Sequence, residues 1–386
     1  MKHVRTGIAL TAIAMSSLLA VTACGQGRGG AQQSGQGIAK EITVAAVNDQ
    51  SGPVGYAGIS ASQGARLAVE QINDQGYLGD GVVIDLAQSD PAGEIERAVS
   101  DMTKAMADND VSAILGPTLG QQAAAVAPLV NQRKVPTVFT QSGSPGVVTG
   151  DYTFRATAPM ETYYSAGDKW LAENDFTKLS LIYNGTLPTY ASLVEDVITP
   201  DQKKYGLSID QRVEVQSTTL DFTSQAQRIA AAKPQAVVML LTAPQSVTFM
   251  KQLRQAGYTG QVLGSTNQSA GMIAPAGPAA DGLVYPVDFS ASMDTPESKA
   301  FVDAFAKEYG EAPDPYAAEG FDALWWIARG IKASNDSSRD GVQKGLAQVA
   351  SQGFAGAMGD ITFDGNDMRV PGVVVKWQDG KEHLLR

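Results

Sequence analysis

Two segments of the chain combine glycine with hydroxyl or amide side chains in a pattern that suits binding of a small polar ligand. VSAILGPTLGQQ covers Val111–Gln122, and VPTVFTQSGSPG covers Val135–Gly146. Each begins with an apolar, β-branched run and passes into a turn signal, which predicts a strand ending there. At the end of the first segment and beyond it, the alanine-rich stretch Gln121–Val130 predicts a helix. The first N–H groups of such a helix have no partner within it, so the junction favours an anion or a small polar ligand.

The composition excludes several kinds of catalytic chemistry. The two histidines are His3 and His383, and Cys24 is the single cysteine among 386 residues. Histidine-dependent or cysteine-dependent triads and His- or Cys-ligated metal sites are therefore excluded from the body of the chain. The stretch Asp364–Asp367 (DGND) lacks the later ligands of a calcium loop and is typical of a polar turn. We expect no enzyme activity, no metal and no cofactor.

The first residues resemble a bacterial export signal. Lys2 and Arg5 precede an apolar segment, Gly7–Ala20, and the sequence VTAC then ends at Cys24. Because this junction resembles a lipobox, we expect residues 1–23 to be a lipoprotein signal peptide and Cys24 to carry lipid on the outer face of the bacterial cell membrane. An ordinary signal peptide with a chance cysteine is the alternative. Residues 24–39, rich in glycine and glutamine, predict a flexible tether.

The charge of the chain argues against nucleic acid as a partner. The formal charge is −11, and removing residues 1–23, which contain Lys2 and Arg5, changes it to −11 − 2 = −13. So acidic a protein would be repelled by a phosphate backbone.

Strands and helices alternate along the rest of the chain. Glu41–Val47 predicts a strand, Ile59–Ile72 a helix, and Val82–Leu86 the next strand. The alternation restarts at Leu179–Tyr183, after a segment around Asp151–Arg155 that predicts a crossing to a second lobe. We therefore expect an α/β protein with two doubly wound parallel-sheet lobes. The segments Gly359–Phe363 and Val370–Trp377 predict a closing pair of strands.

An ordered set of motifs resembles one family. SGPVG, GPTLGQQ, VPTVFTQSGS, FRATAPM and PYAAEGFDAL follow one another as in the periplasmic binding-protein type I family of ABC importers, in particular its leucine/isoleucine/valine and amide group. The resemblance implies two lobes joined by a three-crossover hinge, with a ligand cleft between them. The expected lobes are residues 40–157 with 288–360, and residues 158–287 with 361–386.

The resemblance also implies a set of ligand-binding residues. A carboxylate or similar head group is expected at Gly120, Gln121, Ser142, Gly143 and Ser144. The family typically has a hydroxyl at the position of Gly120, where this chain offers only a backbone N–H. Gly120 is equally explained as a helix-entry glycine. The aromatic walls implied by the resemblance are Tyr56, Tyr190 and Tyr316.

One loop departs from the family pattern. Amino-acid binders of the family hold the ligand ammonium with an acid after the strand that corresponds to Gln261–Leu263, and here the loop reads Gly264-Ser265-Thr266-Asn267. Thr266 is still expected in the site. The acids that could substitute are Glu161, Asp288, Glu319 and Asp322. The solute is accordingly a branched-chain or other amino acid, or an amide, urea or aromatic acid.

The function implied by the resemblance is an extracytoplasmic solute-binding lipoprotein. It would bind a small-molecule solute by cleft closure and deliver it, as a monomer, to ABC permease subunits in the membrane. One alternative is a ligand-sensing module of a membrane signalling protein. A carboxylate-based hydrolase is a third hypothesis, which requires two acids facing each other across the cleft.

Overall fold

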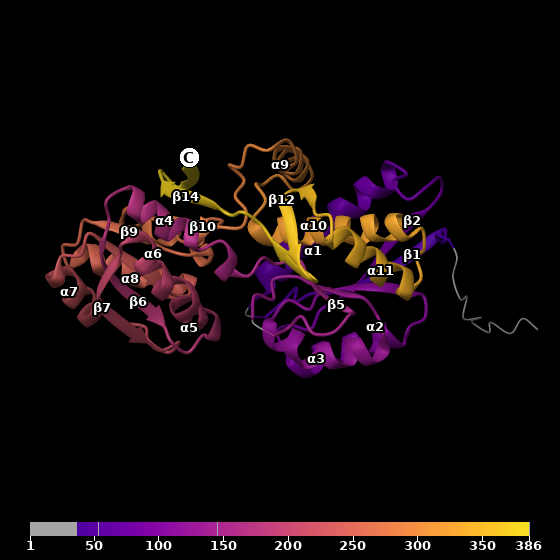
Figure 1. The fold of residues 1–386 in the computed structure, drawn as a ribbon, viewed down its shortest axis with the longest axis horizontal. Helices are drawn as coiled ribbons and strands as arrows, with labels where there is room; N and C mark the ends of the chain where they lie inside the picture. The colour runs from indigo at the N-terminus through magenta and orange to yellow at the C-terminus, as the bar shows by residue number, and fades with distance from the viewer. Residues whose placement is uncertain (1–36, 53, 145, 386) are drawn as a thin grey trace, which may run out of the picture. The chain divides into compact units, whose positions relative to one another are not determined.

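The computed structural model describes residues 37–52, 54–144 and 146–385, so the predicted signal peptide, most of the tether and Cys24 lie outside the described residues. Two sheets form the framework of the described residues, with strand orders β11-β12-β13-β5-β4-β3-β1-β2 and β15-β14-β10-β9-β8-β6-β7. In Figure 1 the strands β1, β5 and β12 lie in one lobe, and β6, β9 and β14 lie in the other. The predicted pair of α/β lobes is confirmed.

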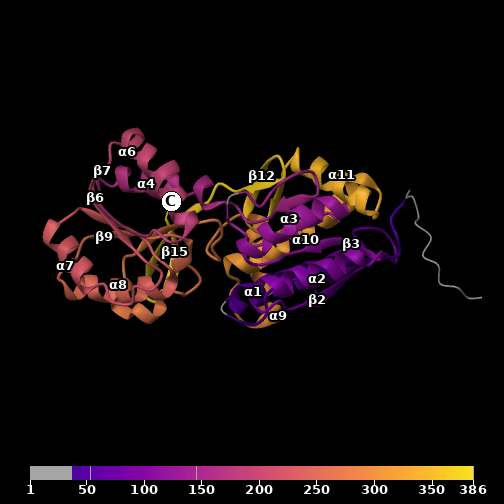
Figure 2. The same ribbon diagram turned by 90° about the horizontal axis from the view of Figure 1, so that it is seen from below.

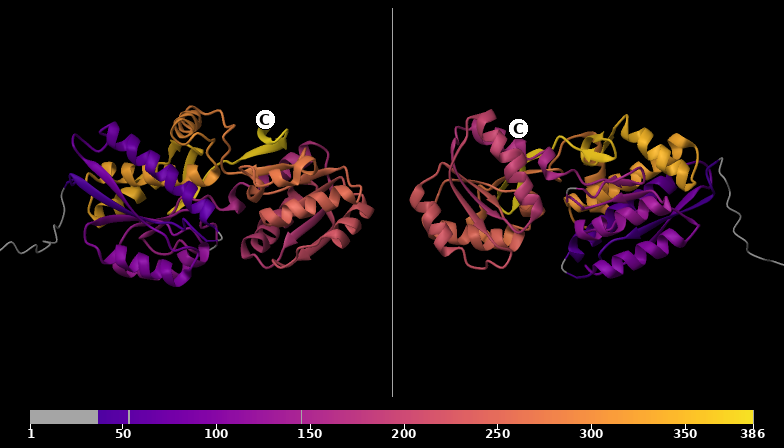
Figure 3. Two further views of the ribbon diagram at one scale, coloured as in Figure 1. Left: turned by 180° about the vertical axis from the view of Figure 1, so that it is seen from behind. Right: turned by 60° about the horizontal axis from the view of Figure 1, so that its bottom comes forward.

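The first lobe contains the beginning of the chain and most of its last third. Its strands are β1 (Glu41–Val47), β2 (Val83–Ser89), β3 (Val111–Leu115), β4 (Thr137–Phe139), β5 (Thr153–Arg155), β11 (Phe354–Gly356), β12 (Gly359–Asp364) and β13 (Asp367–Arg369). Its helices are α1 (Gly55–Asp74), α2 (Ile95–Ala107), α3 (Gly120–Arg133), α9 (Pro296–Tyr309), α10 (Pro315–Ser334) and α11 (Arg339–Ala350). Figure 3 shows early and late segments of the chain together in this lobe.

The second lobe is formed mainly by the middle of the chain. Its strands are β6 (Lys178–Asn184), β7 (Ser208–Val215), β8 (Ala236–Leu240), β9 (Gln261–Leu263), β10 (Val284–Val287), β14 (Val373–Gln378) and β15 (Lys381–Leu385). Its helical elements are η1 (Met160–Thr162), α4 (Ser165–Glu173), α5 (Pro188–Leu193), η2 (Val194–Ile198), α6 (Thr199–Tyr205), α7 (Thr223–Ala232), α8 (Ala243–Gln255), η3 (Thr266–Gln268) and η4 (Ala274–Ala280).

Helices cover both faces of the second sheet, which explains its continuous apolar strands. Along β8, Val238 and Leu240 pack into one hydrophobic cluster, whereas Val237 and Met239 pack into another. In Figure 2, α4 and α6 lie on one side of this sheet and α7 and α8 on the other. A strand buried on both faces has no polar position, so the run AVVML is apolar throughout.

The chain passes between the two sheets three times, after β5, after β10 and after β13. The three predicted crossovers are therefore confirmed. Parallel pairing dominates both sheets, and the antiparallel pairs are β11 with β12, β12 with β13, β10 with β14 and β14 with β15.

The last expected lobe boundary is wrong. Residues 361–386 were expected in the second lobe, but β12 and β13 belong to the first sheet, and the chain changes sheets between Arg369 and Val373. For the same reason β12 and β14 are not a closing pair of strands. Two strands separated by a short polar turn normally form a hairpin, and β12 forms that hairpin with the three-residue strand β13, which the sequence pattern did not reveal.

Candidate functional site

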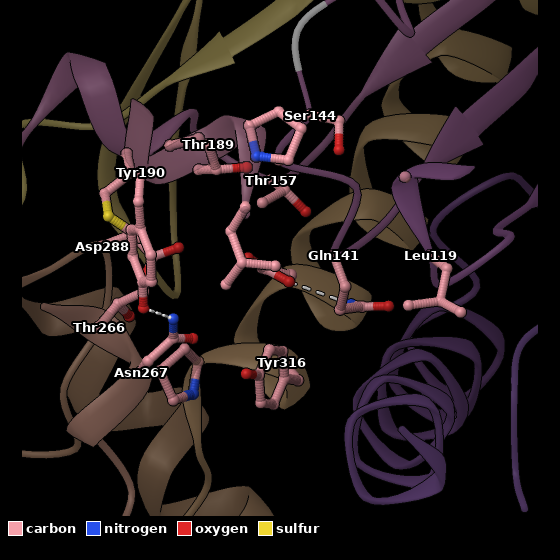
Figure 4. Close-up of a pocket in the computed structure, with 18 of the residues that line it drawn as sticks. Leu119, Gln141, Ser144, Thr157, Thr189, Tyr190, Thr266, Asn267, Asp288 and Tyr316 are labelled. Carbon is pink, nitrogen blue, oxygen red and sulfur yellow. Dashed lines mark hydrogen bonds between the residues drawn. The ribbon is translucent and has the colours of Figure 1, made fainter. Parts of the chain in front are cut away.

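A pocket of about 410 Å³ lies where the two lobes and the crossovers meet. This volume is within the usual range for small-molecule sites. Figure 4 shows Leu119, Gln141 and Ser144 on one side of it and Tyr190, Thr266 and Asn267 on the other. The complete lining consists of Leu119, Gly120, Gln121, Gln141, Gly143, Ser144, Thr157, Ala158, Met160, Tyr163, Leu187, Pro188, Thr189, Tyr190, Thr266, Asn267, Asp288, Pro315, Tyr316 and Glu319.

One end of the pocket presents hydrogen-bond donors, and we call Leu119–Gln121 together with Gly143 and Ser144 the donor end. Helix α3 begins at Gly120, and its first internal hydrogen bond runs from the Ala123 N–H to the Leu119 carbonyl. The N–H groups of Gly120 and Gln121 therefore have no partner within the helix. Gly120 and Gln121 both line the pocket, as does Ser144, and a helix N-terminus beside a hydroxyl is an arrangement that suits a carboxylate.

Gly120 is required by the side chain opposite it. A Cβ atom at position 120 would overlap the Oγ and Cβ atoms of Ser144. The Ser144 hydroxyl thus occupies the space next to the helix terminus that a side chain at position 120 would otherwise fill. The donor end therefore contains a hydroxyl, which comes from Ser144 after β4 and not from position 120.

Arg155 fixes the loop that carries Ser144. Its Nη1 donates to the carbonyl oxygens of Ser142 (3.2 Å) and Ser144 (2.8 Å), and its Nε and Nη2 bind the two oxygens of Asp367 at 2.5 and 2.6 Å. The Arg155 residue is only 5% exposed. A bidentate pair of this kind has little freedom to move, so it holds the loop carbonyls in one orientation.

A second group of pocket residues presents acceptors, and we call Gln141, Thr157, Asp288 and Glu319 the acceptor end. Asp288 follows β10 and is 3% exposed, whereas Glu319 lies on α10 and is 2% exposed. Their carboxyl groups are in hydrogen-bonding contact with each other, and Gln141 Nε2 donates to Glu319 Oε2 (3.0 Å; Figure 4).

Burial dominates the ionisation of this carboxyl pair. It raises the pKa of Asp288 from 3.8 to about 6. It also raises the pKa of Glu319 well above its usual value, and the charge of Asp288 adds to that effect. Two carboxyl groups in direct contact cannot both be ionised without a large electrostatic cost, so the pair holds one proton between them near neutral pH.

The second lobe supplies an aromatic and amide wall. Tyr190 is fully buried, donates from Oη to the Leu241 carbonyl (2.9 Å) and accepts a hydrogen bond from Asn267 Nδ2. Burial raises the pKa of Tyr190 to about 12, so its hydroxyl stays neutral. Tyr163 from the first crossover and Thr266 from η3 complete this wall.

Seven of the nine expected ligand-binding residues line the pocket, namely Gly120, Gln121, Gly143, Ser144, Tyr190, Thr266 and Tyr316. The structure does not bring the other two to its wall. Tyr56 is 48% exposed and packs edge-on behind Tyr316, with ring centroids 5.8 Å apart. Ser142 is fully buried, and its hydroxyl donates to the Pro117 carbonyl (3.2 Å), so it stabilises the turn instead of facing the cavity.

Of the four acids considered as substitutes, Asp288 and Glu319 reach the pocket and the other two do not. The Asp322 carboxylate accepts hydrogen bonds from the backbone N–H groups of Ala357 and Met358 in the first lobe. Glu161 is not part of the lining. Gln141 and Thr157 were not expected in the site at all. One feature of the sequence pointed to Glu319. It follows the expected pocket residue Tyr316 by three positions and therefore lies on the same face of the helix.

A family model described as periplasmic binding protein matches residues 41–381. The chain belongs to the periplasmic binding protein family. The resemblance seen in the sequence motifs is thereby confirmed. The family consists of solute-binding proteins and not of enzymes, and it acts outside the cytoplasm.

Curated relatives match over most of their length. A Leu/Ile/Val-binding protein from Rhizobium johnstonii is 23% identical, with 88% of this chain and 93% of the relative covered. A leucine-, isoleucine-, valine-, threonine- and alanine-binding protein from Pseudomonas aeruginosa is 21% identical, with 84% and 86% covered.

Solved structures share the fold. The substrate-binding protein of a branched-chain amino acid transporter from Streptococcus pneumoniae, in complex with isoleucine, has a TM-score of 0.77 at 21% identity, covering 89% of this chain and 99% of that one. A solute-binding protein of an ABC transporter from R. palustris, in complex with benzoate, has a TM-score of 0.74 at 20% identity, covering 89% and 95%.

The described residues include neither a helix that could span a membrane nor a metal-binding cluster of side chains. None of the helices within residues 37–385 is long and apolar enough to cross a membrane. The same part of the chain contains no cluster of three or more His, Cys, Asp or Glu side chains able to hold a metal ion.

Proposed function

We propose that the pocket binds a small carboxylate-bearing solute, an amino acid or an aromatic acid, for delivery to the permease of an ABC importer. The observation that carries this proposal is the donor end, where the first residues of α3 and Ser144 together line the 410 Å³ pocket. A carboxylate is the ligand group that such donors prefer. The relatives named above, with amino acids or benzoate as ligands, agree with this class.

The lobes suit binding by closure. Each lobe contributes one side of the pocket, and three crossovers join the lobes, so a solute that contacts both sides would favour the closed arrangement. A sensory role would use the same pocket and the same closure. Transport is favoured because the relatives are proteins of ABC transporters.

A hydrolase using Asp288 and Glu319 is disfavoured by their separation. Paired acids of glycosidases stand roughly 5 Å or more apart, which leaves room for the sugar or a water molecule. Asp288 and Glu319 are instead in hydrogen-bonding contact with each other.

The anchoring of the protein is also a proposal. Cys24 lies outside the described residues, and its position after an apolar signal segment supports lipid attachment there. The binding lobes would then act as a monomer at the outer face of the membrane. Mass spectrometry of the N-terminal peptide from the native host tests this proposal, because a mature chain beginning elsewhere than at a lipidated Cys24 contradicts it.

A thermal-melting screen tests the binding function. Amino acids, aromatic acids, amides and ureas are added singly at millimolar concentration, with sugar phosphates as the negative control. A solute present at one hundred times its Kd stabilises the folded state by about 2.7 kcal/mol, which shifts the midpoint by several degrees. Failure of every amino acid and aromatic acid to raise the midpoint contradicts the proposal.

A further inference from the structure

We propose that a second pocket, built entirely from the first lobe, binds a small aromatic carboxylate through Arg329. This pocket has a volume of about 170 Å³, and its lining comes from α1, α9, α10 and β11 with the residue that follows β11. We call it the side pocket. It shares no lining residue with the pocket between the lobes, so the inference goes beyond the proposed function and does not depend on it.

Arg329 is a cation of the side pocket that has aromatic neighbours but no hydrogen-bond acceptor. Its guanidinium carbon lies 5.0 Å from the ring centroid of Phe354 and 5.6 Å from that of Trp325. Its Nε atom is buried without a partner, and no hydrogen bond or ion pair joins the guanidinium to any other residue that the structure describes. A buried donor without an acceptor is unfavourable, so a ligand that supplies an acceptor is favoured there.

The other arginines of the first lobe that are at least partly buried do have acceptors. Arg155 and Arg369 both pair with Asp367, and Arg339 donates to three backbone carbonyl oxygens. These contacts fix loops and strands of the lobe. Arg329 makes no such contact, and it lines a cavity, which is the arrangement expected of a residue that binds an external anion.

Aromatic side chains form the apolar part of the side pocket. Phe301, Phe321, Trp325 and Phe354 line it, and the ring centroids of Phe301 and Phe321 are 4.7 Å apart. An apolar cavity of about 150 Å³ accepts one benzene ring. The side pocket therefore suits an apolar body of that size, with a carboxylate beside the guanidinium of Arg329.

Two acidic residues also line the side pocket, and neither pairs with Arg329. Glu297 is exposed. Asp322 is 1% exposed, and its two carboxylate oxygens accept hydrogen bonds from the backbone N–H groups of Ala357 (2.8 Å) and Met358 (2.9 Å). Burial raises the pKa of Asp322 from 3.8 to about 7. At pH 6 this carboxyl group is therefore largely protonated and does little to repel an anion.

The side pocket and the pocket between the lobes use different parts of α10. Tyr316 and Glu319 line the pocket between the lobes, whereas Asp322, Trp325 and Arg329 line the side pocket. Glu319 and Arg329 are ten residues apart, which corresponds to about 15 Å along a helix. Binding at the two pockets can therefore be measured separately, with Trp325 as the local reporter of the side pocket.

Fluorine NMR of the protein labelled with 5-fluorotryptophan tests the proposal. The chain has four tryptophans, and Trp325→Phe identifies the resonance of Trp325. Benzoate is the probe, and benzyl alcohol is an uncharged probe of similar size. At pH 6 we expect benzoate to shift the Trp325 resonance saturably and to bind about tenfold more tightly than benzyl alcohol, because only benzoate supplies a charged acceptor.

Two variants of α10 separate recognition by Arg329 from a general loss of charge. Arg329→Gln should weaken benzoate binding about tenfold and remove its advantage over benzyl alcohol. Lys332→Gln is the matched control, because Lys332 also lies over an aromatic ring, that of Tyr77, and is outside the lining of the side pocket. It should leave the titration unchanged. If Arg329→Gln does not fold, the comparison of the two probes in the wild-type protein decides the question.

A third variant distinguishes the two pockets. Gly120→Ser places a side chain against Ser144 in the pocket between the lobes and should leave the titration of Trp325 unchanged. Loss of the Trp325 shift in this variant would show that benzoate acts from the pocket between the lobes, which would overturn the side pocket and leave the proposed function intact.

The remaining outcomes also decide the inference. Equal affinity for the two probes, an unchanged titration in Arg329→Gln, or the absence of a saturable Trp325 shift would each overturn it. The expected shift and preference, in a protein whose melting screen is negative for every amino acid and aromatic acid other than benzoate, would support the side pocket while the proposed function fails.

Discussion

The two ends of the pocket are built in different ways. The donor end consists of backbone N–H groups and one hydroxyl, held in place by the Arg155–Asp367 pair behind them. The acceptor end consists of side chains, and its two carboxyl groups are buried without a cation. Backbone N–H groups are positioned by the fold itself at little cost in free energy, whereas buried carboxyl groups destabilise the folded protein when they ionise. The difference indicates that the geometry of the donor end is set by the backbone, whereas the charge of the acceptor end depends on the ionisation of its two carboxyl groups.

The largest expected effect concerns the support of the donor end. Asp367→Ala leaves the Arg155 guanidinium buried without its carboxylate, which should lower the free energy of unfolding by about 4 kcal/mol. Urea denaturation measures this loss. Arg369→Gln is the control, because Arg369 is the more exposed partner of Asp367, and its loss should cost less than about 1 kcal/mol. Equal effects of the two variants would show that Arg155 does not depend on Asp367.

The contrast between the two ends also explains what could be predicted from the sequence. The donor end was predictable because it depends on local features, a strand that runs into Gly-Pro and a second strand end rich in serine and glycine. The acceptor end joins Gln141 to Glu319, which are 178 residues apart, and only the fold brings them together. A buried acid looks like a surface acid in sequence, so Asp288 and Glu319 were two of four possibilities.

The fold, like the pocket, was predictable where the signal is local and not where it depends on tertiary pairing. Apolar strands such as β1 in the first lobe and β8 in the second were predictable because burial on both faces of a sheet leaves a continuous apolar run. The short strands β11 and β13 and helix α11 have no such pattern, since their segments are brief or rich in glycine and polar residues. The change of sheet between β13 and β14 is set by tertiary pairing and has no local signal.

The second-largest expected effect concerns the ionisation of Asp288 at the acceptor end. Because burial raises the pKa of Asp288 from 3.8 to about 6, its contribution favours folding most at low pH and is lost as the pH rises through that range. Two pKa units correspond to about 3 kcal/mol, at about 1.4 kcal/mol each. Asp288→Asn should therefore stabilise the ligand-free protein by up to about 3 kcal/mol at pH 8 and by little at pH 4.

Denaturation at several pH values checks this prediction. The difference in unfolding free energy between Asp288→Asn and wild type should grow between pH 4 and pH 7 and then level off. Asp281→Asn is a suitable control, since Asp281 is exposed and remote from the pocket lining. A difference that stays constant over the whole pH range would mean that Asp288 ionises normally in the folded protein.

The smallest expected effect comes from moving a hydroxyl across the donor end. Gly120→Ser alone places a side chain where Ser144 already lies, so it should weaken solute binding about tenfold. Ser144→Gly alone removes one hydroxyl, and the loss of about 1 kcal/mol corresponds to about fivefold weaker binding. The double variant Gly120→Ser/Ser144→Gly restores one hydroxyl in the same space, and its affinity should return to within about threefold of wild type.

Calorimetry with the solute that gives the largest melting shift measures all three variants. The backbone at Gly120 permits the exchange, because its φ is not in the left-handed region and serine is accepted at the start of a helix. A double variant that binds more weakly than Ser144→Gly would mean that the hydroxyl must approach from the strand-end loop held by Arg155. The donor end would then depend on side-chain position as strictly as the acceptor end does, and the distinction between a backbone-built and a side-chain-built end would fail.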